Sequence, residues 1–224
     1  MSSTSKGTRR RRGATVSRRS RTVWGAFGIA MTAVGGLFWW LQGAPMPRND
    51  GLALPAMVAA DGPSSIEAVF RTRAPLDTKR WQAIVIHHSG SLFGTPASLE
   101  AQHRAMNLEG LGYHFVIGNG SGLSDGEVHV GYRWLDQLPG AHVAGPKGDW
   151  YNRNSIGICI VGDGRRKGFS QEEMHRLTQL VAALCERLHI PADHVYLHSD
   201  LAQVDDPGRL FPEAAFREQL TRAR

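Results

Sequence analysis

Short apolar runs separated by polar turns dominate the pattern of the chain after residue 66. Four runs rich in β-branched or aromatic residues predict buried strands, at 82–86, 113–117, 155–161 and 194–197. The segment 127–134 alternates apolar and polar positions, and the turn sequence Asn-Gly-Ser-Gly at 119–122 precedes it. We therefore expect 127–134 to pair antiparallel with the strand at 113–117.

Cap signals and helical spacing of apolar residues predict the helices. Thr95-Pro96 combines a capping residue with a first-turn proline and begins one helix. Ser170 and Glu173 form a capping box at the start of the main helix, whose apolar positions recur until Pro191 stops it. A closing helix begins at Pro212. Strands interleaved with helices indicate an α/β fold with a single mixed central sheet flanked by helices.

The N-terminal part has a different pattern. Residues 1–22 contain eight Lys and Arg residues and no acidic residue, and Val23–Leu41 is an uncharged apolar run of 19 residues. A helix of that length crosses a hydrocarbon layer of roughly 30 Å, and cations before a single span keep that side in the cytosol. The sequence thus predicts a basic cytoplasmic tail (1–22), a transmembrane anchor or signal segment (23–42), a linker (43–65) and a domain (66–224).

This topology sets the expected partners and location. The formal charge is +6, and the eight cations of the tail leave −2 on the remaining residues. A nuclear or RNA-binding tail is the alternative interpretation of the Arg run, but the adjoining apolar segment explains the same charges. We expect a membrane partner through the N-terminal segment and no nucleic acid. The domain is expected in the cell envelope, anchored by a single pass with its C-terminus outside the cytoplasm, or secreted if the segment is cleaved.

The two cysteines, Cys159 and Cys185, each fall in an apolar periodic segment. Buried free thiols are therefore expected rather than a disulfide.

Two histidines at predicted strand ends and one aspartate in a following turn are candidate metal ligands. His87 and His198 each end an apolar strand, and neighbouring strands would bring both imidazoles to one edge of the sheet. Asp206 follows His198 by eight residues in an Asp-Pro-Gly turn that can fold its carboxylate back. A hydrolytic zinc site needs three such ligands and an open position for water. The alternative is that these histidines only cap strand ends, in a chain with ten histidines.

Five segments together resemble one enzyme family. In chain order they are IVIHHSG, LGYHFVIGNG, GAHVAG, NSIGICIVGD and LHSDLAQVDDPG, between Ala83 and Phe211. They resemble the zinc N-acetylmuramoyl-L-alanine amidases, a group that includes phage lysozyme-amidases and peptidoglycan recognition proteins. Any single segment is unspecific, but several in the right order are rarely accidental.

The resemblance implies roles for particular residues. The zinc ligands would be His87, His198 and Asp206, with His88 as a neighbour only. Tyr113 would be the catalytic tyrosine. His142, in the polar and Gly-rich loop 139–154, would be the second catalytic residue, lining the substrate groove.

Some positions carry a structural alternative or a departure from the family pattern. Tyr113 is otherwise an ordinary strand aromatic and His142 an ordinary loop histidine. His114 is expected to be structural. Val204 occupies the position two before the third ligand, where active relatives often have Lys or Thr, and it cannot donate a hydrogen bond.

The implied function is zinc-dependent hydrolysis of the amide bond between the lactyl group of N-acetylmuramic acid and L-alanine in peptidoglycan. The expected partners are peptidoglycan or muropeptides, and the protein is expected to be a monomer. Three alternatives stay open: a non-catalytic peptidoglycan-binding module, a zinc hydrolase acting on another amide, and a structural protein whose histidines only pack.

Overall fold

The computed structural model describes residues 52–54 and 66–223. Six strands form one mixed sheet in the order β1-β4-β3-β5-β2-β6. The strands are β1 (Leu52–Leu54), β2 (Ala83–His88), β3 (Phe115–Ile117), β4 (Val128–Val130), β5 (Ser155–Ile160) and β6 (Val195–Leu197). β5 is parallel to both β2 and β3, β6 is parallel to β2, and β4 is antiparallel to both β1 and β3. The predicted α/β fold with a single mixed sheet is confirmed.

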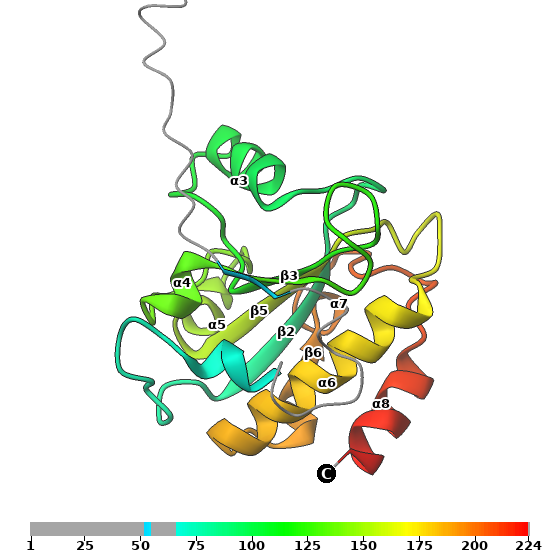
Figure 1. The fold of residues 1–224 in the computed structure, drawn as a ribbon. Coiled ribbons are helices and arrows are strands. Elements are labelled where there is room, and N and C mark those ends of the chain that lie inside the picture. The colour runs from blue at the N-terminus through cyan, green and yellow to red at the C-terminus, as the bar shows by residue number, and fades with distance from the viewer. Residues whose placement is uncertain (1–51, 55–65, 224) are drawn as a thin grey trace, which may run out of the picture. The chain divides into compact units, whose positions relative to one another are not determined.

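Helices cover both faces of this sheet. They are η2 (Glu67–Phe70), α3 (Pro96–Ala105), α4 (Tyr132–Leu135), α5 (Gly148–Asn154), α6 (Gln171–Leu188), η3 (Ala192–His194), α7 (His198–Leu201) and α8 (Glu213–Arg222). Figure 1 shows α6 and α8 side by side on one face, with α3 on the other. The larger apolar cluster joins α6 and α8 to Ile84 and Ile86 of β2, and a smaller one joins Leu99 of α3 to Val116 and Cys159.

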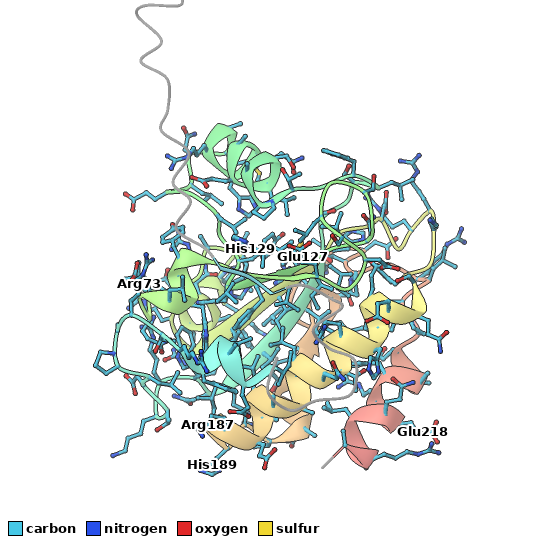
Figure 2. The ribbon with its side chains drawn as sticks, in the orientation of Figure 1. Arg73, Glu127, His129, Arg187, His189 and Glu218 are labelled. Carbon is cyan, nitrogen blue, oxygen red and sulfur yellow. The ribbon has the colours of Figure 1, made fainter. Side chains whose placement is uncertain are left out.

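The predicted helix ends are confirmed. Ser170 Oγ accepts the Glu173 N–H at 3.0 Å, and Glu173 Oε2 accepts the Ser170 N–H at 2.6 Å. Thr95 caps α3, with Pro96 at its first position. At the other end of α6, Arg187 and His189 project from the terminal turn (Figure 2), and His189 adopts a left-handed backbone with φ of 56°.

The strand containing the histidine pair is longer than predicted. β2 runs through His87 and His88, which pair with Cys159 and Ile160 of β5. The parallel partner supplies backbone hydrogen bonds beyond the last aliphatic residue, Ile86, so the polar side chains lie within the strand.

The predicted strand at 127–134 is wrong in its second half. β4 ends at Val130, and α4 follows. The Gly131 N–H donates to the His114 carbonyl at 2.8 Å, and the buried Arg133 guanidinium donates to the carbonyls of Leu111, Pro139 and Glu109. The Arg133 guanidinium, bound to three carbonyls, holds this segment in the single helical turn of α4.

Three other segments differ from expectation. The loop 139–154 contains the helix α5, residues 52–54 of the predicted linker form the edge strand β1, and His198 begins α7 rather than ending a strand. The segments 1–22 and 23–42 and the rest of the linker lie outside the described residues. Among the residues that are described, no helix is long and apolar enough to cross a membrane. Cys159 and Cys185 are buried free thiols, as predicted.

Candidate metal centre and active site

The three predicted ligands meet at one point. Asp206 Oδ2 lies 2.8 Å from His198 Nδ1 and 3.1 Å from His87 Nδ1. One ligand atom from each of the three residues falls within 4.8 Å of the other two. Two imidazole nitrogens and one carboxylate oxygen are the donor set of a hydrolytic zinc site with an open position.

Strand pairing brings the two histidines together. Ile86 of β2 is paired with Leu197 of β6, so the next residues, His87 and His198, emerge at the same sheet edge. Their ring centres lie 4.5 Å apart. Asp206 returns to them because the Ser199 N–H donates to its backbone carbonyl at 2.9 Å.

The charge states of this group suit a cation. Burial raises the pKa of Asp206, but hydrogen bonds from His198 and His87 outweigh it, and the pKa falls well below its usual range. Burial lowers the pKa of His87, which Asp206 opposes only in part. At neutral pH the centre therefore presents an anionic carboxylate and a neutral His87, the forms that bind a metal.

His142 lies behind His87. His142 Nδ1 is 3.1 Å from His87 Nε2, and both side chains are buried. Asn152 of α5 holds the loop, because its Oδ1 accepts the N–H groups of His142 and Val143 at 2.9 and 3.0 Å. A Cβ at Gly157 would lie 2.5 Å from the His142 ring, so glycine is required there. Burial lowers the pKa of His142 well below its usual range, so its imidazole is neutral.

Tyr113 faces the same group from just before β3. Its ring centre is 5.2 Å from that of His87 and 5.0 Å from that of His103. Burial raises the pKa of Tyr113 well above its usual value. The hydroxyl therefore keeps its proton at neutral pH and is available as a donor.

The remaining sequence candidates lie around this group. His114 is buried, its Nδ1 accepts the Gly157 N–H at 2.9 Å, and burial lowers its pKa to about 3, so the predicted structural role is confirmed. His88 contributes its backbone, because its N–H donates to Asp206 Oδ1 at 2.6 Å. Val204 is 43% exposed, so a longer side chain fits at this position.

Two residues near the centre were missed by reasoning from the sequence. His103 in α3 is buried against Tyr113, and its Nδ1 accepts the Gly112 N–H at 2.7 Å. Its place on the apolar stripe of the predicted helix was the available signal. Asp163, after β5, is buried within 3.9 Å of His88. It is the last residue of the segment NSIGICIVGD, and that place was the available signal.

A cavity lies beside α7. Its volume is about 540 Å³, and its lining includes Lys147, Ser199, Asp200 and Gln203. Ser199 directly follows His198, but His198 itself, His87 and Asp206 are not among the lining residues.

The family comparison agrees with this geometry. The model of the N-acetylmuramoyl-L-alanine amidase family matches residues 77–209. The chain belongs to this family. All five predicted site residues of the amidase domain lie inside the matched segment.

Relatives of this amidase domain include recognition proteins and phage enzymes. It is 33% identical over 105 residues to a peptidoglycan recognition protein of Trichoplusia ni, covering 46% of this chain and 51% of the relative. It is 35% identical over 88 residues to the endolysin of Enterobacteria phage T3, covering 37% and 50%. The chain thus spans about half the length of the curated relatives it matches. The solved N-acetylmuramoyl-L-alanine amidase LysC from Clostridium intestinale URNW shares the fold, with a TM-score of 0.54 and 24% identity over 67% of this chain and 92% of that one.

Proposed function

We propose that this chain is a zinc-dependent amidase that hydrolyses the bond between the lactyl group of N-acetylmuramic acid and L-alanine in peptidoglycan. One observation carries the proposal: within a domain of the amidase family, His87, His198 and Asp206 bring one ligand atom each to within 4.8 Å of one another. These residues would hold the zinc ion. A bound zinc ion would supply Lewis acidity and lower the pKa of a water ligand to about 7.

The other residues of the chain prepare this centre for attack on the lactyl carbonyl. If His87 binds the metal through Nδ1, its proton sits on Nε2, and His142 Nδ1 accepts it at 3.1 Å. This contact fixes the tautomer and the orientation of the ligand. Tyr113 keeps its hydroxyl proton and can donate it as a hydrogen bond to the carbonyl oxygen as negative charge develops.

The second candidate is a peptidoglycan-binding module that does not cut. Val204 favours it, because this position lacks the donor that active relatives often have. Tyr113 supplies a different donor at the same centre, so we favour the amidase. The two proposals predict the same ligand and differ only in whether an amide bond breaks.

Digestion of purified sacculi tests the proposal. The full chain, purified in a mild detergent with one equivalent of Zn²⁺, should release peptides with a new L-alanine amino terminus. Chelation should stop this release, and His87→Ala, His198→Ala and Asp206→Ala should each lose zinc, because a three-ligand site tolerates little subtraction. His175→Ala, which changes an exposed histidine of α6, is the matched control and should keep both zinc and activity. Tight binding of sacculi without new amino termini would establish the binding module instead.

We also propose that the domain works outside the cytoplasm. The eight cations before the apolar run Val23–Leu41 support this orientation. A reporter enzyme that folds only outside the cytoplasm, fused after Arg224, should be active. Activity of a cytoplasm-specific reporter at the same position would refute the orientation.

A further inference from the structure

The loop that follows β5 carries an ion pair between the buried carboxylate of Asp163 and the exposed guanidinium of Arg165. Asp163 is 2% exposed, and the Arg165 guanidinium binds its carboxylate with two contacts, Nε to Oδ1 at 2.7 Å and Nη2 to Oδ2 at 3.0 Å. The Arg165 backbone N–H also donates to Oδ1, at 3.2 Å. A two-pronged contact of this kind fixes orientation as well as distance. The peptide group of Gly164, between the two residues, is held in place as a result.

Gly164 connects this ion pair to His88. The Gly164 N–H donates to His88 Nδ1 at 3.0 Å, so Nδ1 is an acceptor and the ring N–H of His88 is on Nε2. His88 Nε2 lies 3.9 Å from Asp206 Oδ1. The same carboxylate oxygen accepts the backbone N–H of His88 at 2.6 Å. The backbone N–H and the imidazole Nε2 of His88 thus both face Asp206 Oδ1, an oxygen of the proposed third metal ligand.

Gly164 also packs directly against the turn that follows Asp206. A Cβ at Gly164 would lie 2.0 Å from the Pro207 carbonyl oxygen, and a Cβ at Gly208 would lie 2.4 Å from the Gly164 carbonyl carbon. The Leu210 N–H donates to the Gly164 carbonyl at 2.9 Å. The two loops therefore meet backbone to backbone, and a shift of one displaces the other.

The geometry points to Asp163, Arg165 and His88 as positioning residues for the third metal ligand, a role that rests on the proposed zinc chemistry. Through Gly164 they hold the Asp206 carboxylate so that His88 engages Oδ1 and only Oδ2 faces the two imidazole Nδ1 atoms. A carboxylate that presented only one oxygen to a bound ion would leave a position free for water, as a hydrolytic zinc site requires.

Metal binding without peptidoglycan tests this role. The full chain is titrated with Zn²⁺ against a chromophoric chelator and, separately, with Co²⁺, whose visible absorption weakens when the coordination number rises above four. Arg165→Met should lower Zn²⁺ affinity by about tenfold, the scale of lost groups that support a ligand, and should weaken the Co²⁺ absorption. Arg165→Lys keeps the charge but loses the planar, two-pronged guanidinium. Its Zn²⁺ affinity and Co²⁺ absorption should therefore lie between those of the parent chain and of Arg165→Met.

Two further variants separate positioning from general damage. Arg165→Met leaves a buried carboxylate without its partner, which alone can destabilise the fold. The double variant Asp163→Asn with Arg165→Met removes both charges, and it should still bind Zn²⁺ weakly and give the weakened Co²⁺ spectrum while unfolding cooperatively. Arg166→Met, on the same exposed loop, is the control and should match the parent chain.

The outcomes distinguish this inference from the proposed function. Parent-like Zn²⁺ affinity and Co²⁺ absorption in the folded Arg165→Met and double variants would overturn the positioning role and leave the amidase proposal standing. A parent chain that binds no Zn²⁺ would overturn both.

Discussion

His87 Nε2 lies 3.1 Å from His142 Nδ1, and the His87 Nδ1 atom on the other side of the ring lies 3.1 Å from Asp206 Oδ2. The His87 imidazole therefore joins the candidate metal-binding group to the buried His142. The family resemblance implies that His142 is a catalytic residue that lines the substrate groove. Its burial, 8% exposed, and its contact with His87 Nε2 support a positioning role as well.

This relationship gives the first prediction. His142→Ala leaves the His87 Nε2 proton without its acceptor, so Zn²⁺ affinity of the full chain should fall by about tenfold. His142→Gln places a carbonyl oxygen near the same point and should recover part of the affinity. Competition with a chromophoric chelator measures both. Parent-like affinity in the folded His142→Ala variant would confine His142 to the substrate side of the mechanism.

Tyr113 gives a prediction about turnover rather than metal binding. Its hydroxyl lies outside the three-ligand group, so Tyr113→Phe should leave zinc content unchanged. Turnover should fall by about a hundredfold, or about 3 kcal/mol in activation free energy, as for other lost oxyanion donors. Release of L-alanine-terminated peptide at saturating substrate measures the effect. Tyr196→Phe, in β6, is the control, and equal turnover in both variants would remove Tyr113 from the mechanism.

Val204 gives a prediction in the opposite direction. Lysine fits there without repacking, because Val204 is 43% exposed. If a donor at this position stabilises the developing oxyanion, Val204→Lys should raise turnover and leave zinc content unchanged. Val204→Met, similar in length but without a donor, is the matched control. Equal turnover in the Lys and Met variants would show that Tyr113 already fills the role.

Much of the centre is predictable because His87 and His198 directly follow apolar runs of the sequence. The apolar runs before His87 and His198 predict strands, and their parallel pairing brings both imidazoles to one edge. Loop contacts are not predictable in the same way. Gly157 of β5 leaves space for the ring of His142, which belongs to a loop. The His88 N–H donates to the Asp206 carboxylate, 118 residues away in the sequence. Neither contact leaves a periodic signal in the sequence.

The misjudged elements have similar causes. The alternating residues at 127–134 favour a strand locally, but the carbonyls that Arg133 binds come from residues 109, 111 and 139 and impose a turn. Residues 52–54 have no sustained period of their own and become a strand only through pairing with β4. Local propensity is overridden by tertiary contacts in both cases.

Glu173 gives a prediction about stability and pH. This residue of the α6 capping box is 3% exposed, and among the described residues its Oε1 atom has no hydrogen-bond partner. Burial raises the pKa of Glu173 to about 7, although the Ser170 N–H donates to its carboxylate. The folded state therefore holds a proton that the unfolded state releases near its usual pKa of about 4.3.

The sign of the effect follows from this proton. Between pH 4.5 and 7 the folded state binds more protons, so stability falls as pH rises, and the full loss of about 3 kcal/mol is reached near pH 8. Glu173→Gln keeps an acceptor for the Ser170 N–H and cannot ionise, so its stability relative to the parent should rise by about that amount from pH 5 to pH 8. Urea unfolding of both chains at the two pH values measures the difference, in which the other titrating groups cancel. Glu172→Gln, in the same turn but only half-buried, should follow the parent. If the difference in unfolding free energy between the parent and Glu173→Gln stays constant with pH, the Glu173 carboxylate titrates normally despite its burial.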